Sequence, residues 1–163
     1  MAVPTQTETR TIITNTDRLL CVHYTAITTG GGGDTATNTI VDIDDASNYL
    51  HNGVALSTDG FNSSTGVPLT SLTIEKLWAT SDVVNVVSTM HGRLEFDATA
   101  NVGIAGVGAN YATANGLHLD YTPFGGLQNT KASGFTGNIV VTHNSMSNVG
   151  DSLLITLQMK KVY

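Results

Sequence analysis

The sequence predicts an all-β protein, an antiparallel sandwich or barrel, and three observations support this class. Apolar and polar residues alternate with a period of two in several runs, while the helical period is nearly absent. Thr, Val and Ile fill the alternating runs, as half-buried strands prefer. Turn signals separate the runs, and no segment could supply the helical crossovers of a parallel sheet, so the strands should be antiparallel.

Alternation places the expected strands and their buried faces. Residues 69–80 put Leu72, Ile74 and Trp78 on one face, so we expect Trp78 to point into the core. Residues 93–97 put Leu94 and Phe96 inward in the same way. The expected strands are residues 18–28, 69–80, 83–90, 93–97, 138–142 and 152–162.

Turn signals predict where these strands end, because Gly, Asn and Asp favour the backbone conformations of tight turns. The pattern allows a short helix over residues 44–51, with Asp44 or Asp45 as its N-cap and Asn52-Gly53 at its end. The expected turns are residues 30–33, 52–53, 59–60, 81–82, 91–92, 115–116, 125–126 and 133–134.

The chain is the size of one domain, since 163 residues suffice for a single hydrophobic core. Its start is polar and rich in Thr, apart from Ile12 and Ile13. We therefore expect an extended N-terminal arm over residues 1–16 and a single β-sandwich domain over residues 17–163.

Charge and composition exclude several classes of partner. The net charge is −6 and the Lys and Arg residues are scattered, whereas a phosphate backbone needs clustered cations, so nucleic acid is not expected. No run is apolar enough for a membrane helix and no signal peptide is recognisable, so we expect folding in a cytoplasm. The single cysteine, Cys21, should be a small buried hydrophobe. Only 12% of residues are charged, which suggests that other protein covers part of the surface.

One short motif, Gly150-Asp151-Ser152-Leu153, spells the nucleophile block of an esterase and lipase family. In that family the block follows the first strand of an α/β fold, and an Asp-x-x-His block lies near the C-terminus. Here Ser152 leads into the last expected strand, and no such block follows. We expect a tight turn and no enzymatic activity, with an esterase built on Ser152 as the alternative.

Neither glycine-rich segment predicts a cofactor site. No Lys-Ser or Lys-Thr follows residues 30–33, so they do not form a phosphate-binding loop. Residues 103–108 do not match the dinucleotide fingerprint, and no βαβ unit surrounds them. We expect no cofactor.

Metal ligands are weakly indicated. Asp42, Asp44 and Asp45 could hold Ca²⁺ through carboxylate oxygens, but their spacing is not that of an EF-hand. A solvated turn is the expectation and calcium the alternative. The histidines lie far apart and lack the spacing of zinc ligands, so no metal site is expected.

Carbohydrate binding by a sandwich would require exposed aromatic side chains on one sheet face. Trp78 lies in an apolar run, where a core position is expected. A carbohydrate-binding module stays as an alternative function.

Residues 98–119 contain no Asp, Glu, Lys or Arg. Interface cores are depleted in charge. We therefore predict a subunit contact that includes Val102, Ile104, Val107 and Tyr111, with a buried hairpin of the same domain as the alternative.

The layout as a whole combines a Thr-rich arm, a domain rich in Gly, Thr and Asn, and the long final run Asp151-Ser-Leu-Leu-Ile-Thr-Leu-Gln-Met-Lys-Lys-Val-Tyr163. In layout, over its whole length, the chain resembles the small virion proteins of tailed bacteriophages, of the capsid decoration or cement type. The resemblance implies a jelly-roll-like sandwich that trimerises, binds the major capsid protein on the capsid exterior, and stabilises contacts between capsid subunits.

The arm is a second candidate contact, because an extended segment can add a strand to a neighbour's sheet edge. We expect a chain without residues 1–16 to fold but no longer attach to its shell. The alternative functions are a phage tail, neck or fibre-associated structural protein and the carbohydrate-binding module. The arm residues predicted to bind the partner are Thr5, Thr7, Thr9, Thr11, Ile12 and Ile13.

Overall fold

The computed structural model describes residues 6–16, 18–30, 36–42, 50–51, 54–55, 71–84, 89–110, 114–128, 133–144 and 146–162. Its elements are β1 (Gln6–Asn15), β2 (Leu19–Thr28), β3 (Ala36–Val41), β4 (Leu50–His51), β5 (Val54–Ala55), β6 (Ser71–Asp82), β7 (Thr89–Phe96), β8 (Val102–Asn110), β9 (Ala114–Asp120), the 3-10 helix η2 (Thr122–Phe124), β10 (Ile139–Asn144) and β11 (Ser152–Val162).

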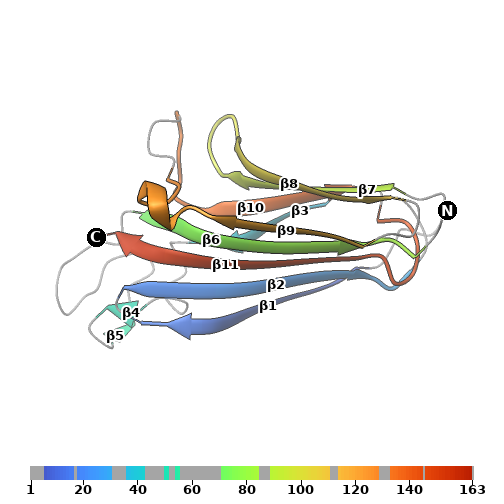
Figure 1. Cartoon of the computed structure of the whole chain (residues 1–163), viewed down its shortest axis with the longest axis horizontal. Coiled ribbons are helices and arrows are strands. Elements are labelled where there is room, and N and C mark those ends of the chain that lie inside the picture. Colours follow the sequence, from blue (N-terminus) through green and yellow to red (C-terminus); the bar gives the residue numbers. More distant parts are fainter. Residues whose placement is uncertain are drawn as a thin grey trace.

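Two antiparallel sheets form the body of the molecule. The five-stranded sheet has the order β1-β2-β11-β6-β9, and the four-stranded sheet has the order β3-β10-β7-β8. Figure 1 shows them as two stacked layers, with η2 at one end. β4 and β5 form a separate two-stranded ladder.

The path of the chain between the layers is that of a jelly roll. From β2 it crosses to β3, returns in β6, crosses to β7 and β8, returns in β9, crosses to β10 and returns in β11. Most consecutive strands therefore lie in different sheets, as in two interlocked Greek keys. The predicted antiparallel β-sandwich is confirmed.

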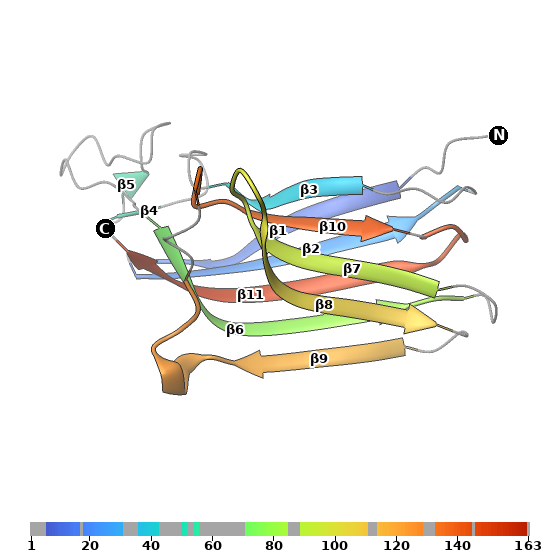
Figure 2. The ribbon, with the colours of Figure 1, turned by 90° about the horizontal axis from the view of Figure 1, so that it is seen from above.

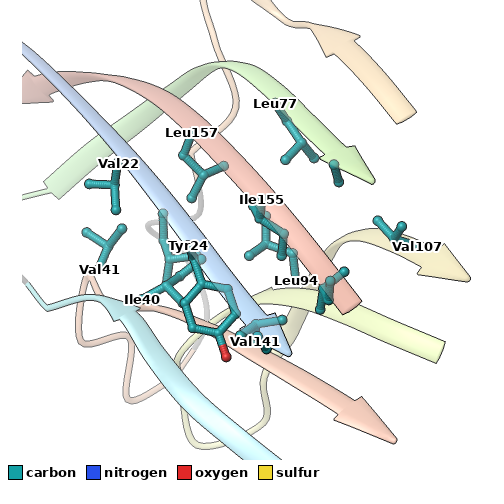
Figure 3. Packing of buried hydrophobic residues seen from close by; sticks show 14 of the residues in the cluster. Val22, Tyr24, Ile40, Val41, Leu77, Leu94, Val107, Val141, Ile155 and Leu157 are labelled. Atoms are coloured by element: carbon teal, nitrogen blue, oxygen red, sulfur yellow. The ribbon is translucent and has the colours of Figure 1, made fainter. Parts of the chain in front are cut away.

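The core lies between the inner faces of the two sheets. In β11, the burial pattern alternates along the strand, with every second residue from Leu153 to Met159 buried. Burying one such aliphatic side chain contributes about 1.5–3 kcal/mol. Figure 3 shows the facing residues Val22, Tyr24, Leu77, Ile155 and Leu157 of the five-stranded sheet, and Ile40, Val41, Leu94, Val107 and Val141 of the four-stranded sheet.

The strands with regular alternation agree with the sequence prediction. The expected strand over residues 152–162 is β11 with the same bounds, and the one over residues 18–28 is β2. Residues 93–97 lie largely in β7, with Leu94 and Phe96 buried as predicted. Residues 138–142 lie largely in β10.

Trp78 does not point into the core, so this prediction was wrong. β6 carries one extra residue, Glu75, opposite β11. Such a bulge reverses the alternation of faces beyond it. Ile74 is buried before the bulge and Leu77 after it, whereas Trp78 is 37% exposed on the outer face.

Three expected turns lie inside strands, because residues 81–82 belong to β6, 91–92 to β7 and 115–116 to β9. Gly92 permits close packing of the two layers: a Cβ there would lie 3.1 Å from Leu153 Cδ2. The turns expected at residues 125–126 and 133–134 are present.

Two predicted elements need correction at their ends. β6 extends to Asp82 and β7 begins at Thr89, so the expected strand over residues 83–90 was wrong at residues 83–84. Leu50–His51 is a strand that pairs with β5, so the expected helix over residues 44–51 was wrong there. Residues 43–49 lie outside the described residues.

The loop before β11 is organised by the buried carboxylate of Asp151. Its Oδ1 accepts a hydrogen bond from the backbone N–H of Val84 at 3.1 Å. Its Oδ2 accepts from the backbone N–H groups of Ser147 at 3.0 Å and Asn148 at 2.9 Å. Gly150 has a φ of 97°, a conformation that glycine adopts without strain. The predicted tight turn before Ser152 is therefore present.

Candidate functional site

Each sheet ends in two edge strands whose outer backbone groups could pair further. The edges of the five-stranded sheet are β1 and β9, and those of the four-stranded sheet are β3 and β8. Figure 2 shows β8 and β9 along one margin of the sandwich, and β1 and β3 along the other. We name these margins the β8/β9 side and the β1/β3 side.

The β8/β9 side is poor in charge and open at its backbone. From β8 to the end of β9, Asp120 is the only charged residue in either strand. Val102 is 38% exposed, and Gly103 and Gly106 are exposed beside it. A Cβ added at Gly103, Gly106 or Gly116 would meet no atom within 4 Å. The faces of both strands are therefore uncovered at these glycines, and neither strand is paired with a further strand in the described sheets.

Aliphatic side chains of β8 and β9 close the core at this side of the sandwich. Ile104, Leu117 and Leu119 are half-buried and pack against the core cluster. The two sheets are also linked here by a hydrogen bond, in which Asn115 Nδ2 donates to the Gly108 carbonyl oxygen at 2.7 Å. Apart from Asp120 at the end of β9, the two edge strands of the β8/β9 side thus carry no charged residue in either layer.

The predicted contact residues of this region lie at different depths. Val102 is exposed, Ile104 is half-buried and Val107 is buried in the core. Tyr111 lies outside the described residues. The alternative of a buried hairpin is wrong, because β8 and β9 belong to different sheets and both are edge strands.

The predicted arm forms a strand of the domain's own sheet over most of its length. β1 pairs with β2 from Gln6 opposite Thr28 to Asn15 opposite Leu20. The segment is extended, as predicted, but it hydrogen-bonds within the chain. Its attachment to a neighbour stays a prediction.

The arm residues predicted to bind a partner divide between the two faces of β1. Thr7, Thr9 and Thr11 are exposed together on the outer face. Ile12 packs against the core, and a register shift between Ile12 and Thr14 leaves Ile13 58% exposed. Thr5 lies outside the described residues.

A polar cluster closes the β1/β3 side. Glu8 of β1 accepts a hydrogen bond through Oε1 from Asn38 Nδ2 of β3, at 2.6 Å. The same oxygen lies 3.5 Å from His143 Nε2 of β10, and Asn38 Nδ2 lies 3.4 Å from Tyr24 Oη of β2. We call these four residues the Glu8 cluster. It joins strands of both sheets.

Burial shifts the pKa values of two members of this cluster, His143 and Tyr24. His143 is fully buried, and neither ring nitrogen has a hydrogen-bond partner among the described residues. Desolvation lowers the pKa of His143, which favours the neutral ring, and the nearby Glu8 charge opposes this shift. Burial, followed by the Glu8 charge, raises the pKa of Tyr24.

The candidate thiol and metal-ligating groups do not come together in a site within the described residues. Cys21 is half-buried on the outer face of the five-stranded sheet, where burial raises the pKa of its thiol. The predicted small buried hydrophobe is thus only half-buried, because the outer face is only partly covered. Asp42 is half-buried after β3, whereas Asp44 and Asp45 lie outside the described residues. The residues that the structure describes contain no cluster of metal-ligating side chains.

The outer face of the five-stranded sheet carries a group that sequence reasoning missed. The rings of Trp78 and His118 stack with centroids 5.2 Å apart and planes at 8°. Their pairing depends on the bulge in β6 and on the register with β9, neither of which periodicity shows. No described helix is long and apolar enough to span a membrane.

Fold and surface together define the chain as a jelly-roll β-sandwich with one neutral open side. No protein-family model and no curated protein sequence matches it. Among solved structures it is similar to the enzymatically active domain of tailspike protein 4 of bacteriophage CBA120, with a TM-score of 0.34 and 10% identity over 95% of this chain and 19% of that chain. The chain thus spans about a fifth of the length of that relative.

Two further solved structures are similar. One is a chain of Desmodium yellow mottle tymovirus, with a TM-score of 0.39 and 10% identity over 100% of this chain and 91% of that chain. The other is the family 11 carbohydrate-binding module of Clostridium thermocellum, in complex with a β-1,3-1,4-mixed-linked tetrasaccharide, with a TM-score of 0.30 and 10% identity over 96% of this chain and 83% of that chain. Likeness at this level says nothing of what the present chain binds.

Proposed function

We propose that this chain is a non-enzymatic structural protein that assembles through its β8/β9 side, and that the assembly is a virion. In this role it binds the capsid exterior and stabilises contacts between capsid subunits, as the resemblance in layout implies. The observation that carries the proposal is the neutral, open backbone of β8 beside that of β9.

The physical argument concerns how proteins manage sheet edges. An unpaired edge invites strand addition, and monomeric proteins oppose it with charges, bulges or covering segments. β8 has a bulge at Ile104 but no charged residue, and Gly103 and Gly106 place no side chain over its face. An added strand would gain backbone hydrogen bonds, with register set by side chains such as Val102.

Closed symmetry would allow several copies to use the same edge around one axis. A trimer is the assembly that we favour. A mass of six or twelve copies would instead favour the alternative, a tail, neck or fibre-associated protein. The jelly-roll architecture recurs in viral capsid and lectin domains, which suits a virion protein.

The assembly is tested by light scattering on the purified chain and two matched variants. Gly106→Lys places a charge on the outer face of β8, where an added Cβ meets no atom. Thr9→Lys places the same charge on β1, at a position that is also exposed. We expect the parent and Thr9→Lys to form the same oligomer, and Gly106→Lys to be a monomer. A monomeric parent, or an unchanged Gly106→Lys oligomer, would contradict the proposal.

The virion assignment has its own test. Peptides of this chain should be detected by mass spectrometry in virions purified on a density gradient, at a fixed stoichiometry to the major capsid protein. If the chain occurs only in the lysate, the virion part of the proposal is wrong.

A further inference from the structure

The outer face of the five-stranded sheet carries a row of side chains that crosses every strand. The register pairs Thr11 with His23, His23 with Thr156, Thr156 with Trp78, and Trp78 with His118. Side chains of directly paired residues stand side by side on the same face. We call these five residues the Trp78 row.

The polar half of the row is held in place by hydrogen bonds. His23 Nδ1 lies 2.8 Å from Thr156 Oγ1, and His23 Nε2 lies 3.1 Å from Thr25 Oγ1. Both hydroxyl groups belong to half-buried residues and keep further capacity as donor or acceptor. Hydroxyl and imidazole groups therefore hold one another in a fixed orientation across β2 and β11, with Thr25 in the adjacent row.

The aromatic half of the row is partly uncovered. Trp78 is 37% exposed although it stacks on His118. Gly116 lies two residues before His118 in β9, on the same face and opposite Thr80. A Cβ added there would meet no atom within 4 Å. The missing side chain leaves space beside the two rings, on the same face.

The charge of this surface indicates the kind of ligand. The Trp78 row and the adjacent row of Thr9, Thr25, Leu154, Thr80 and Gly116 contain no Asp, Glu, Lys or Arg. The nearest charged pair across β6 and β9, Lys76 and Asp120, is two register pairs from Trp78 and His118, in the next row of the same face, and its charges are matched at 3.7 Å. An anionic ligand would therefore find no unmatched cation in these rows, and a peptide strand would pair with an edge rather than with a face.

We propose that the Trp78 row binds a neutral glycan, in addition to the assembly role of the β8/β9 side. Sugar rings present an apolar C–H face and a rim of hydroxyl groups. The Trp78–His118 stack supplies the apolar surface. The hydroxyl groups of Thr156 and Thr25, held in orientation by the two ring nitrogens of His23, keep capacity to hydrogen-bond a sugar hydroxyl. We infer the ligand class from the Trp78–His118 stack and the uncharged polar side chains in line with it.

The proposal is tested with an array of neutral oligosaccharides of glucose, galactose, mannose and N-acetylhexosamines, printed beside sialylated and sulfated glycans. We expect the parent to bind at least one neutral class. Titration with that oligosaccharide should change the emission of Trp78, which is the only tryptophan of the chain.

Matched variants locate the site. Trp78→Ala should weaken binding at least about tenfold, and His118→Ala by several-fold, since each removes part of the stack. Phe124→Ala serves as the control, because Phe124 is an exposed aromatic residue, 83% exposed, in η2. Circular dichroism and the light-scattering mass should be the same for all three variants, so that a folding or assembly defect is distinguished.

Three outcomes would overturn the inference while leaving the assembly role intact. They are the absence of binding to any neutral glycan, binding restricted to sialylated or sulfated glycans, and neutral-glycan binding that Trp78→Ala does not weaken. Loss of the oligomer in Trp78→Ala without any glycan binding would assign the face to protein contact instead, and would also overturn it.

Discussion

The edge strands of the β1/β3 side and of the β8/β9 side differ in charge and in the hydrogen bonds that link the two sheets. On the β1/β3 side, Glu8 and the other members of its cluster connect both sheets and place an acidic residue at the edge. On the β8/β9 side, the neutral Asn115 makes the link, and Gly103 and Gly106 of β8 are exposed with no atom above them. Inward-pointing charge is a known protection of edge strands. In the proposed assembly, the β8/β9 side is the one that meets another chain.

The largest expected difference between the two sides concerns packing. Tyr24 is 3% exposed near the β1/β3 side, whereas Leu119 is only half-buried near the β8/β9 side. Tyr24→Ala should lower the free energy of unfolding by about 3–5 kcal/mol. Leu119→Ala should lower it by about 1–2 kcal/mol, because less apolar surface is lost. Urea unfolding measures both, and Tyr24→Phe gives a folded reference if the alanine variant does not accumulate. Equal losses would mean that the two sides do not differ in packing.

The next effect isolates the Glu8 cluster. Glu8→Ala removes a charged acceptor and should cost about 1–2 kcal/mol, since Asn38 Nδ2 then keeps only its longer contact with Tyr24 Oη. Thr9→Ala, at the next residue but on the exposed face, should change stability by less than about 0.5 kcal/mol. If the two variants are equally stable in thermal and urea unfolding, the cluster does not close its side of the sandwich.

Acid should weaken the β1/β3 side in particular. Burial lowers the pKa of His143 below its ordinary value of 6.5, so the unfolded chain binds this proton more readily than the folded one. Stability from this group is therefore intact above about pH 6.5 and is lost as the pH falls through that value, by at most about 1.4 kcal/mol per pH unit.

The pH effect can be assigned by substitution. His143→Leu removes the titrating ring from its apolar surroundings, so it should lose less stability than the parent between pH 8 and pH 5. His118→Ala, on the outer face near the β8/β9 side, should retain the parent's dependence on His143. Urea unfolding at several pH values measures the difference. A parent and a His143→Leu chain with parallel pH profiles would exclude a role for His143.

The smallest expected change in stability comes from removing the hydrogen bond between Asn115 and Gly108. Asn115→Ala removes the hydrogen bond to the Gly108 carbonyl oxygen, but both residues lie where water can replace it. The free energy of unfolding should change by less than about 1 kcal/mol. A loss as large as that of Glu8→Ala would show that the two links are equivalent.

The sequence predicted the fold class and the strands in which alternation is unbroken. β11 is an example, because its residues alternate from Ser152 to Val162 without an extra residue of its own. Trp78 was assigned to the wrong face because the single extra residue at Glu75 shifts the phase of β6, and a residue count alone does not locate a bulge.

The candidate site was predictable only in part. The absence of charge over residues 98–119 marked the region, but the sequence does not show that β8 and β9 end different sheets and meet at one margin. The Thr-rich start is equally compatible with a free arm and with an edge strand, since both are extended. The Glu8 cluster depends on contacts between residues more than a hundred positions apart, such as Glu8 and His143, which local patterns do not encode.

Hydrogen–deuterium exchange on the assembled and the dissociated chain tests the central claim most directly. Amides in β8 and β9 should become protected upon assembly, while those of β1 and β3 exchange alike in both states. Protection confined to β1 and β3, with unchanged exchange in β8 and β9, would contradict the assignment of the neutral side as the interface.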